Sequence, residues 1–414
     1  MSNPGLFILI FNSGSSSLKW QLFEVTDAGD PTPRAQGMVT AFGEQARCAW
    51  LSDGQRGEAR GGIGDHHAAA LWILNWLQGR GLTNGLAAIG HRVVHGGDSF
   101  TGPVFIDPEV MAAIESLNAL APLHNPLALQ VIRACESFFK PSVPMVAVFD
   151  TAFFRDLPDH ARRYALPDEW TRNHGIRRYG FHGIAHRWLC QRYHEISGAG
   201  IGASRIITLQ LGQGCSMAAI RGGVPVETSM GFTPLEGLIM ATRCGDIDPG
   251  ALLHLAERLG IKPLREALNQ RAGLLGISGI SADMRELIML EAQGHAGAKR
   301  AIDAFCHRVR KYLGAYLAVL GGADAIVFGG GIGEHAPVIR ERICAGQEWC
   351  GLVMDEAANA RTLGDKEACI SSSSSRMAVY VVPVDEALLI ARDAWDCVQR
   401  DQPKNLSWSR SEND

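Results

Sequence analysis

Long hydrophobic runs are missing from this 414-residue sequence. No stretch approaches the roughly 18 consecutive apolar residues that mark a membrane-spanning helix. The apolar run from Leu6 to Phe11 is short, has no basic flank and ends in Asn12-Ser13-Gly14, whereas a signal peptide needs a longer apolar region and a cleavage site. We therefore expect neither a signal peptide nor a membrane partner.

Excess positive charge and paired cysteines are also missing. The formal net charge is −4 at pH 7, so there is no broad basic field to hold nucleic acid or an anionic membrane surface. An anionic substrate would have to be met by individual Arg or Lys side chains. The ten cysteines include no C-x-x-C pair. In a chain of this length, that spacing favours reduced thiols in a cytoplasmic protein over a disulfide framework.

Two common phosphate-binding signatures do not occur at the glycine-rich turns. The sequence has no G-x-x-x-x-G-K-[ST] motif, and the stretch 329–334 lacks the G-x-G-x-x-G spacing of a dinucleotide-binding turn. Small-residue turns nevertheless follow apolar strands at 12–17, 212–216 and 329–334. A single turn of this kind is most often only a tight turn. Three of them favour a nucleotide, because such turns let backbone N–H groups approach phosphate oxygens.

Strand and helix patterns alternate along the whole chain, which predicts an α/β architecture. We expect strands at Leu6–Phe11, Leu18–Glu24, Ala87–His95, Pro144–Phe149, Arg205–Leu211, Met217–Arg221, Asp324–Phe328 and Met377–Pro383. We expect helices at 66–79, Pro108–Ala121, Pro126–Phe139, Ala251–Leu259, Lys262–Gln270, Gly297–Leu320 and Asp385–Cys397. The order strand, small turn, strand occurs near residue 14 and again near residue 213, and two copies of one fold would be its natural consequence.

Several charged residues stand at positions suited to ligands. Arg92 lies in an apolar strand that ends in glycines, where it could bind an anion or form a structural salt bridge. His91 and His95 are four residues apart, but the valines between them favour a strand and the Glu of H-E-x-x-H is missing, so zinc is disfavoured. Asp150 ends an apolar strand, where catalytic groups often lie in open α/β sheets, although a helix N-cap fits equally well.

Other candidates lie in loops or beside the first turn. Residues 160–192 contain seven arginines interleaved with aromatic residues, which is one pattern of a nucleic-acid surface, but the acidic net charge disfavours that function. In this segment His182 stands between glycines, where a ligand could approach closely. Residues 228–248 carry Arg243 in a glycine-rich loop without periodicity, and such loops are usually functional. Lys19 could reach a phosphate as a point charge or be an exposed strand lysine.

Several stretches, taken in order, resemble the motifs of the acetate kinase family. They are Asn12–Lys19 (NSGSSSLK), Gly90–Gly97 (GHRVVHGG), Phe149–Phe153 (FDTAF), Arg178–Gly183 (RYGFHG), Met230–Gly237 (MGFTPLEG), Thr242–Pro249 (TRCGDIDP) and Gly331–Glu334 (GIGE). The resemblance runs from about residue 8 to about residue 396. It implies the α/β fold of acetate and sugar kinases, Hsp70 and actin (ribonuclease H-like), in which two related domains close over a nucleotide cleft.

The same resemblance implies a domain organisation and a homodimer. Residues 1–151 and 385–400 would form an N-terminal domain that binds the acid and the metal, and residues 152–384 a nucleotide-binding domain. Residues 401–414 are polar, and we expect a frayed tail there.

The implied activity is reversible, Mg²⁺-dependent transfer of the ATP γ-phosphoryl group to acetate, giving acetyl phosphate and ADP. Mn²⁺ could replace Mg²⁺, and propionate or butyrate could replace acetate. In the family pattern Arg92 and Arg243 bind the carboxylate and the phosphoryl group during its transfer, and His182 hydrogen-bonds an equatorial oxygen. Asp150 matches the residue usually called the proton acceptor. A fatty-acid carboxylate, with a pKa of around 4, is already ionised at pH 7, so we expect Asp150 to orient Arg92 or the hydrated metal instead.

The resemblance also implies binding residues. The Mg²⁺ ligands would be Asn12 and Glu386. The acyl group would lie against Arg92, Val94, Leu123, Phe181 and Pro234. The nucleotide and its phosphates would contact Ser15, Ser17, Lys19, Gln210, Leu211, Gly212, Gln213, Gly214, Asp283, Met284, Arg285, Gly331, Ile332, Gly333, Glu334 and His335.

Two alternatives stay open at this point. Gln213 and His335 stand where the family commonly has Asn, which leaves the nucleotide preference open. A nucleotide-binding module of the actin or Hsp70 type, without transfer to an acid, is a remote alternative. The four residues Arg92, Asp150, His182 and Arg243 together argue against it.

Overall fold

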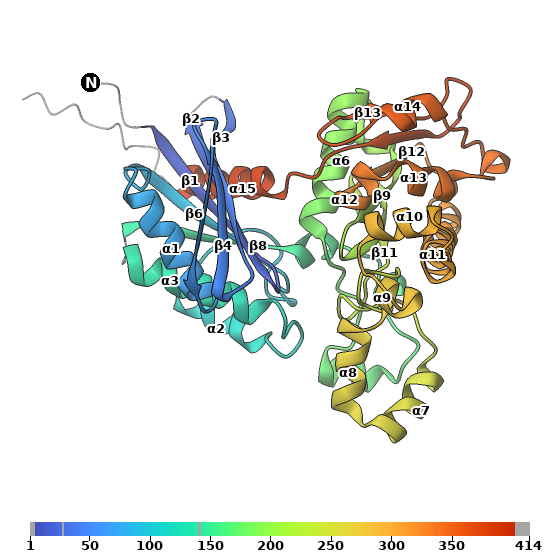
Figure 1. Cartoon of the computed structure of the whole chain (residues 1–414), viewed down its shortest axis with the longest axis horizontal. Helices are drawn as coiled ribbons and strands as arrows, with labels where there is room; N and C mark the ends of the chain where they lie inside the picture. The colour runs from blue at the N-terminus through green and yellow to red at the C-terminus, as the bar shows by residue number, and fades with distance from the viewer. Residues whose placement is uncertain (1–4, 27–28, 140–141, 402–414) are drawn as a thin grey trace, which may run out of the picture. The chain divides into compact units, whose positions relative to one another are not determined.

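The computed structural model describes residues 5–26, 29–139 and 142–401, which fall into two compact units (Figure 1). Unit 1 comprises the described residues of Met1–Ala152 and Asp385–Asp414, and unit 2 is Phe153–Val384. Apart from Asp401, the tail expected at 401–414 lies outside the described residues. No helix in the described ranges is both long and apolar enough to span a membrane.

Unit 1 is built on an eight-stranded sheet in the order β5-β4-β3-β2-β1-β6-β8-β7. Its strands are β1 (Leu6–Ser13), β2 (Ser17–Thr26), β3 (Gly29–Thr40), β4 (Gly43–Ser52), β5 (Gln55–Ile63), β6 (Leu86–Val93), β7 (Val104–Phe105) and β8 (Met145–Phe149). Its helices are α1 (His66–Gln78), α2 (Pro108–Ser116), α3 (Asn125–Phe139) and α15 (Glu386–Asp401). A short 3₁₀ helix, η2 (Asp150–Phe154), leads into unit 2.

Unit 2 is built on a six-stranded sheet in the order β11-β10-β9-β12-β14-β13. Its strands are β9 (Arg205–Leu211), β10 (Cys215–Arg221), β11 (Val224–Thr228), β12 (Ala325–Gly329), β13 (Ala368–Cys369) and β14 (Ala378–Val381). Its α-helices are α4 (Asp159–Arg162), α5 (Asp168–His174), α6 (Gly183–Ser197), α7 (Pro249–Leu259), α8 (Ile261–Gln270), α9 (Gly273–Ser278), α10 (Met284–Ala292), α11 (Ala296–Leu320), α12 (Gly330–His335), α13 (Pro337–Cys344) and α14 (Glu356–Arg361). Two further 3₁₀ helices are η3 (Ile201–Ala203) and η4 (Glu348–Cys350).

The two sheets share one topology. In unit 1, β1, β2 and β3 form an antiparallel meander, β6 and β8 continue the sheet parallel to β1, and β7 closes it antiparallel. In unit 2, β9, β10 and β11 form the meander, β12 and β14 run parallel to β9, and β13 closes the sheet antiparallel. The repeated strand–turn–strand pattern in the sequence therefore marks a repeated fold.

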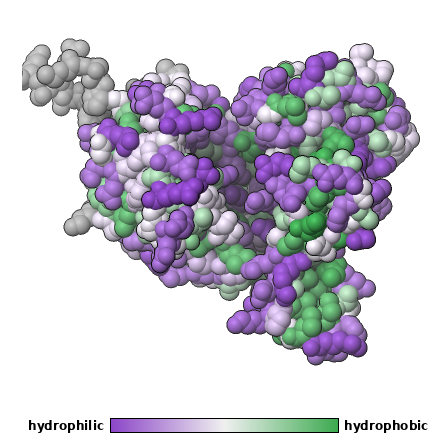
Figure 2. All heavy atoms as spheres, viewed as in Figure 1, coloured by the Kyte–Doolittle hydropathy of each residue, from purple (hydrophilic) through white to green (hydrophobic). Residues whose placement is uncertain are grey.

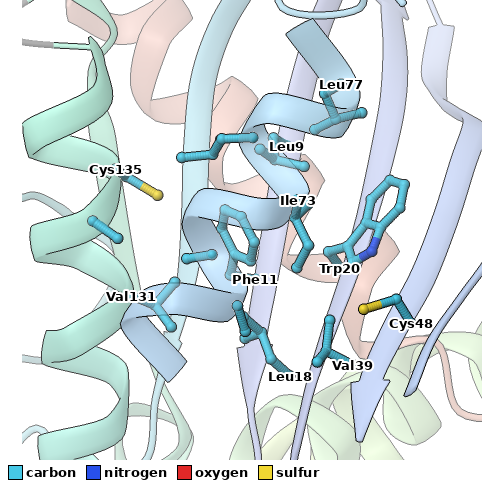
Figure 3. Close-up of a cluster of buried hydrophobic side chains, with 14 of the residues drawn as sticks. Leu9, Phe11, Leu18, Trp20, Val39, Cys48, Ile73, Leu77, Val131 and Cys135 are labelled. Atoms are coloured by element: carbon cyan, nitrogen blue, oxygen red, sulfur yellow. The ribbon is translucent and has the colours of Figure 1, made fainter. Parts of the chain in front are cut away.

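The core of unit 1 lies between the sheet and the helices α1 and α3 (Figure 3). Alternate residues of β1 and β2 point toward these helices, as the two-residue period of a strand requires. The labelled side chains are Leu9, Phe11, Leu18, Trp20, Val39, Cys48, Ile73, Leu77, Val131 and Cys135, and all of them are buried. Helix α15 packs on β1 and β6, so the C-terminal segment completes unit 1.

Most of the predicted elements are present, but some bounds and one element type are wrong. The predicted strand Ala87–His95 ends at Val93, and the predicted helix Pro108–Ala121 ends at Ser116. The stretch 329–334 was expected to be a turn and is mostly the short helix α12. Gly330 turns the chain there with a φ of +75°, and its N–H donates to Glu334 Oε1 at 2.7 Å, which stabilises the first helical turn.

Candidate active site

The parallel strands of unit 1 bring three predicted residues to one edge of the sheet. Phe11 of β1 pairs with His91 of β6, and Val93 of β6 pairs with Phe149 of β8, so these strands end at the same level. Asn12 lies near the end of β1, Arg92 near the end of β6 and Asp150 directly after β8. Glu386 joins them as the first residue of α15.

Arg92 is the centre of this cluster. Its Nε donates to Asp150 Oδ1 at 3.0 Å, and its Nη2 donates to Asp150 Oδ2 at 2.6 Å. Its Nη1 donates to Asn12 Oδ1 at 3.0 Å and lies 3.6 Å from Glu386 Oε2. Burial alone would lower the pKa of Arg92, but the attraction of Asp150 and Glu386 outweighs burial and raises it above its ordinary value. Arg92 is therefore a fixed positive charge.

Asn12 and Glu386 provide a donor set that fits a magnesium ion. Both carry the hard oxygen atoms that Mg²⁺ prefers, and Asn12 Nδ2 donates to Glu386 Oε2 at 2.9 Å, so the two side chains are adjacent. Within residues 5–26, 29–139 and 142–401, no group of three or more His, Cys, Asp or Glu side chains could hold a metal. Mg²⁺ usually takes one or two protein oxygens together with water and substrate phosphates.

The first small-residue turn joins β1 and β2 and carries the predicted phosphate contacts. Ser15 is exposed, Ser17 is half-buried, and Lys19 is an exposed residue of β2 directly opposite Asn12. The ammonium group and the hydroxyl groups therefore lie on the same hairpin as one of the proposed metal ligands.

His66, which the sequence patterns did not single out, fixes this turn. Nε2 of His66 donates to the Gly14 carbonyl oxygen at 2.8 Å, since a carbonyl can only accept. The Gly14 N–H donates in turn to the Ser17 carbonyl oxygen at 2.8 Å. The backbone conformation of the turn is therefore set from α1.

In unit 2, His182, Gly214 and Arg243 lie close together. A Cβ atom built on Gly214 would stand 3.2 Å from Nε2 of His182 and 3.8 Å from Nη1 of Arg243. The glycine therefore leaves room where one cationic and one imidazole side chain meet. His182 Nδ1 lies 2.9 Å from Ser216 Oγ, which orients the ring.

The backbone of His182 is strained. Its φ is +58°, a left-handed conformation that costs energy for a residue with a Cβ, and the residue precedes the first turn of α6. Among the non-glycine residues that the structure describes, Ala41 and Asp53 also have positive φ, and both lie in hairpin turns. His182 is the one of the three that belongs to a candidate site, where such strain is common.

The loop between β11 and α7 carries Pro234 and Arg243 and is held by buried polar contacts. Arg243 Nη1 donates to the Pro234 carbonyl oxygen at 3.0 Å. Glu236 accepts a hydrogen bond from the Tyr164 hydroxyl and another from Arg178 Nη2 at 2.8 Å. Burial, and then the charge of Glu236, raises the pKa of Tyr164, so this hydroxyl stays protonated as the donor.

A second carboxylate closes the same loop. Asp246 accepts from the Gly237 N–H at 2.9 Å and from the Tyr312 hydroxyl at 2.9 Å. Arg308 adds an ion pair with Asp246 at 3.7 Å. The loop is thus an ordered structure, which a segment without periodicity does not reveal in sequence.

The predicted nucleotide segments 210–214 and 331–335 lie side by side. Gly329 at the end of β12 pairs with Gln210 at the end of β9, and α12 packs on β9. The carboxylate of Glu334 accepts from the Gly330 N–H at 2.7 Å and the Val384 N–H at 3.0 Å. Both bonds go to Oε1, so this carboxylate joins the start of α12 to the segment that follows β14.

The other predicted binding residues differ in exposure. Asp283 caps the N-terminus of α10 and forms an ion pair with the exposed Arg285 at 2.6 Å. Met284 is buried within the same helix. Of the predicted acyl-pocket residues, Val94 and Phe181 are buried, Pro234 is half-buried, and Leu123 is exposed in the connection between α2 and α3.

The arginines of residues 160–192 are largely committed to carboxylates. Arg163 pairs with Asp159 and Asp168, Arg172 pairs with Asp168, and Arg192 pairs with Glu195 and Glu367. Arg178 pairs with Glu236 and Glu227. Charges neutralised in this way are poor phosphate contacts, so the segment does not favour a nucleic-acid surface.

Comparison with known proteins gives a consistent result over nearly the whole chain. Residues 7–392 match the Acetokinase family. The chain is 45% identical to the acetate kinase of Chloroherpeton thalassium, over 95% of this chain and 99% of that protein. A solved structure of Porphyromonas gingivalis acetate kinase is 40% identical, with a TM-score of 0.86 over 94% of this chain and 99% of that one. A propionate kinase from Francisella tularensis is 35% identical, with a TM-score of 0.88 over the same shares.

Proposed function

Because this chain belongs to the Acetokinase family, we propose that it is an acetate kinase, which transfers the γ-phosphoryl group of ATP to acetate. An oxygen of the acetate carboxylate forms a bond to the γ-phosphorus, the bond from that phosphorus to the bridging oxygen breaks, and ADP leaves. The reverse reaction uses the same groups. The fold is the two-domain fold of acetate and sugar kinases, Hsp70 and actin.

The observation that carries this proposal is the cluster around Arg92. Three of its N–H groups donate to Asp150 and Asn12, Nη1 also lies beside Glu386, and Nη2 carries a second N–H group that can donate to an anion. A guanidinium held in this way can bind a small carboxylate at a fixed angle. Asp150 is a positioning residue in this mechanism, because the ionised acid has no proton to give.

His182 and Arg243 are assigned to the phosphoryl group that is transferred. The transition state is loose and carries its charge on equatorial oxygens, so fixed positive charge and hydrogen-bond donors stabilise it. His182 Nε2 and Arg243 Nη1 both lie close to the space beside Gly214, which supports assigning them to those oxygens. Lys19 and the hydroxyls of Ser15 and Ser17 bind the other phosphates as donors on one hairpin.

The nucleotide itself is assigned to unit 2. Gln210–Gly214 and Gly331–His335 lie at the ends of adjacent strands, which supports a role in holding ATP or ADP. Asp283, Met284 and Arg285 on α10 are assigned to the same ligand. Unit 2 would thus be the nucleotide-binding domain, and unit 1 would bind the acid and the metal.

Magnesium is assigned to Asn12 and Glu386. When bound, Mg²⁺ neutralises charge on the phosphate oxygens. Mn²⁺ fits the same oxygen donors. Glu386 also faces Arg92, so the same carboxylate that would meet the metal helps to set the guanidinium that would meet the acid.

One assay tests the activity and the choice of acid. Purified protein is incubated with Mg·ATP, hydroxylamine and acetate, propionate or butyrate, and the acyl phosphate is trapped as a hydroxamate. We expect product with acetate above the others, because an added methylene in a small apolar pocket is worth about 1–3 kcal/mol, roughly 5- to 150-fold. A higher kcat/KM with propionate than with acetate would make propionate the preferred substrate. The similarity to a propionate kinase is the reason for including this acid.

A pair of variants tests whether product formation in this assay depends on Arg92. Arg92→Ala should abolish hydroxamate formation, whereas Arg133→Ala, which removes an exposed arginine paired with Glu115, should leave it unchanged. If the native protein binds ATP but gives no hydroxamate with any of the three acids, the chain is a nucleotide-binding module instead.

The proposal includes a homodimer and a cytoplasmic location. Helix α7 buries none of its residues, α8 buries only Leu264, and Figure 2 shows hydrophobic residues gathered over these helices. Leu253, Leu259 and Ile261 are 69%, 53% and 68% exposed. A second copy of the chain is the occupant we assign to this apolar face.

All ten cysteines are unbridged, which supports a reducing compartment.

A further inference from the structure

A continuous row of buried polar side chains leads from the sheet of unit 2 to His182. Thr208 Oγ1 in β9 lies 2.7 Å from Nδ1 of His186 in α6. Nε2 of His186 lies 2.8 Å from Ser216 Oγ in β10, and Ser216 Oγ lies 2.9 Å from Nδ1 of His182. Thr208, His186 and Ser216 are fully buried. None of the motifs that resemble the acetate kinase family contains Thr208, His186 or Ser216, although Ser216 ends the small-residue turn 212–216.

The direction of these hydrogen bonds can be worked out from their donors. A neutral imidazole has one N–H donor and one acceptor nitrogen, and a hydroxyl has one hydrogen to donate. Burial lowers the pKa of His186 to about 3, so that ring is neutral near pH 7. The row can therefore run in one of two directions, from Thr208 toward His182 or from His182 toward Thr208.

The hydroxyl of Thr208 decides between the two directions. In the part of the chain that the structure describes, Nδ1 of His186 is the one hydrogen-bond partner of this hydroxyl. If His186 carried its hydrogen on Nδ1, the hydroxyl hydrogen of Thr208 would be buried without an acceptor, which is unfavourable. Thr208 therefore donates to Nδ1 of His186, and the hydrogen of that ring is on Nε2.

The remaining assignments follow in order. His186 Nε2–H donates to the oxygen of Ser216, so the hydroxyl hydrogen of Ser216 is available to the ring of His182. Ser216 donates it to Nδ1 of His182. A hydrogen on Nδ1 of His182 would confront the hydroxyl hydrogen of Ser216. The hydrogen of the His182 ring is therefore on Nε2, the nitrogen that faces Gly214 and Arg243.

We propose that Thr208, His186 and Ser216 are positioning residues that hold His182 as the Nε2–H tautomer, so that it donates to a phosphoryl oxygen. The last clause rests on the proposed function, whereas the tautomer does not. A neutral ring with the opposite tautomer would present a lone pair to an anionic oxygen and repel it. The strained backbone of His182 fits this role, because a φ of +58° is kept where one ring orientation is required.

Nuclear magnetic resonance of the histidine rings tests the tautomer without any substrate. The unliganded protein is labelled with ¹⁵N-histidine, and His182→Asn assigns the signals of that ring among the 14 histidines. Long-range ¹H–¹⁵N correlations show which nitrogen carries the hydrogen. We expect Nε2–H in the native protein, a mixture of tautomers in Ser216→Ala and Thr208→Val, and Nε2–H again in the hydroxyl-retaining controls Ser216→Thr and Thr208→Ser.

Two outcomes would overturn the proposal. One is a hydrogen on Nδ1 of His182 in the native protein. The other is an unchanged tautomer in both Ser216→Ala and Thr208→Val, with folding verified by circular dichroism, since the row would then not set the ring.

The hydroxamate assay adds a kinetic readout. We expect kcat of Ser216→Ala to fall about tenfold, less than the ~10²- to 10³-fold typical of losing a direct donor, with KM for acetate within about twofold. Ser216→Thr should restore most of kcat. If the native protein forms no hydroxamate, the proposed function fails, while the ring spectra still decide the tautomer. Equal kcat in Ser216→Ala and the native protein would mean that the row does not serve catalysis.

Discussion

Asp150 illustrates how burial limits what a single side chain can do. Only 1% of its side chain is exposed, and both of its oxygens accept hydrogen bonds from Arg92. A carboxylate engaged in this way is a poor base, because protonating it would break a buried ion pair. These contacts support an effect on the reaction through the guanidinium, which Asp150 orients and keeps charged.

Replacing Asp150 with Asn tests this positioning role. We expect kcat to fall by about 10²- to 10³-fold, because the amide accepts only one of the two Arg92 hydrogen bonds and the guanidinium loses its angle. The acid limb of the kcat–pH profile should not move, since no base has been removed. Asp156→Asn, at an exposed carboxylate beside Arg155, is the control. An acid limb that is present in the native enzyme and absent in Asp150→Asn would identify Asp150 as a base.

The burial of His91 leads to a prediction about how protein stability depends on pH. Its ring stacks on Phe11, and Nε2 has no hydrogen-bond partner among the described residues. Burial lowers the pKa of His91 to about 3, from 6.5 in an unfolded chain. As the pH falls below 6.5, the unfolded state takes up the proton first, so this histidine makes the protein less stable. Its contribution between pH 7 and pH 5 is a loss of about 2 kcal/mol.

Urea unfolding of His91→Phe at pH 7 and pH 5 measures that contribution. The aromatic ring keeps the stack on Phe11, so we expect similar stability at pH 7 and about 2 kcal/mol less acid loss than in the native protein. His95 and His186 are also buried with lowered pKa values, so a reduced pH dependence should remain. Identical pH dependence in the two proteins would mean that His91 is protonated or solvated in the folded state.

The site residues show which functional side chains can be predicted from sequence patterns and which cannot. Asn12, Arg92 and Asp150 could be named because each ends an apolar strand or lies within a motif. Ser216 and His186 lie in stretches that the sequence singled out, the turn 212–216 and the segment 160–192, but no pattern there gave either side chain a role. Their importance comes from a contact between a strand and a helix, and the only local signals were a serine at the end of a small-residue turn and a histidine four residues after His182.

At the scale of elements, the loop between β11 and α7 is held by side chains from three other segments. Tyr164 precedes α5, Arg178 follows α5, and Tyr312 belongs to α11. These contacts fix Glu236 and Asp246, and Arg243 lies between those two anchors. The sequence predicted that the loop is functional, but its order depends on partners about 60 to 70 residues away, which no local pattern encodes.

Gly231 is the tightest point of this loop. A Cβ atom there would overlap the carboxylate of Glu236 and the hydroxyl of Tyr164. We expect Gly231→Ala to separate these two groups and to lower stability by about 1–3 kcal/mol. It should also lower kcat, since Arg243 lies in the same loop. Thermal unfolding and the hydroxamate assay measure the two effects.

Gly314 provides the matched control for that substitution. It lies in α11, and a Cβ atom there would meet open space. Gly314→Ala should be neutral or raise stability by up to about 1 kcal/mol, because alanine is the better helix former. If Gly231→Ala behaved like Gly314→Ala, the contact between Glu236 and Tyr164 would not hold the loop.

At the scale of the whole molecule, the repeated sheet topology explains which parts of the fold were predictable. The first two strands of each meander and the parallel strands β6, β8, β12 and β14 are largely buried and apolar, and they were predicted from sequence. Strands β3, β4, β5, β7, β11 and β13 were missed. β5 is mostly exposed, and β3 contains Pro31 and Pro33, so neither shows the apolar alternation of a half-buried strand. The missed strands are the outer ones of each sheet, including β3 and β11, which occupy equivalent places in the two meanders.

The exposed apolar face of α7 and α8 leads to a prediction about assembly. A helix that fully buries none of its residues gains little packing energy within its own chain, so a partner surface would account for its exposed apolar residues. We expect light scattering after size exclusion to give about twice the chain mass of 44.7 kDa. The double variant Leu253→Glu/Ile261→Glu should give a single-chain mass, because two unpaired carboxylates would be buried in the interface.

Met289→Glu is the control for that variant, since Met289 is an exposed apolar residue of α10 with 57% of its surface accessible. It should keep the native mass, because it removes a similar apolar group from a different surface. A native protein of single-chain mass would exclude the homodimer at the concentration measured. A dimer that persists in Leu253→Glu/Ile261→Glu would place the interface elsewhere, and α7 and α8 would then need another occupant.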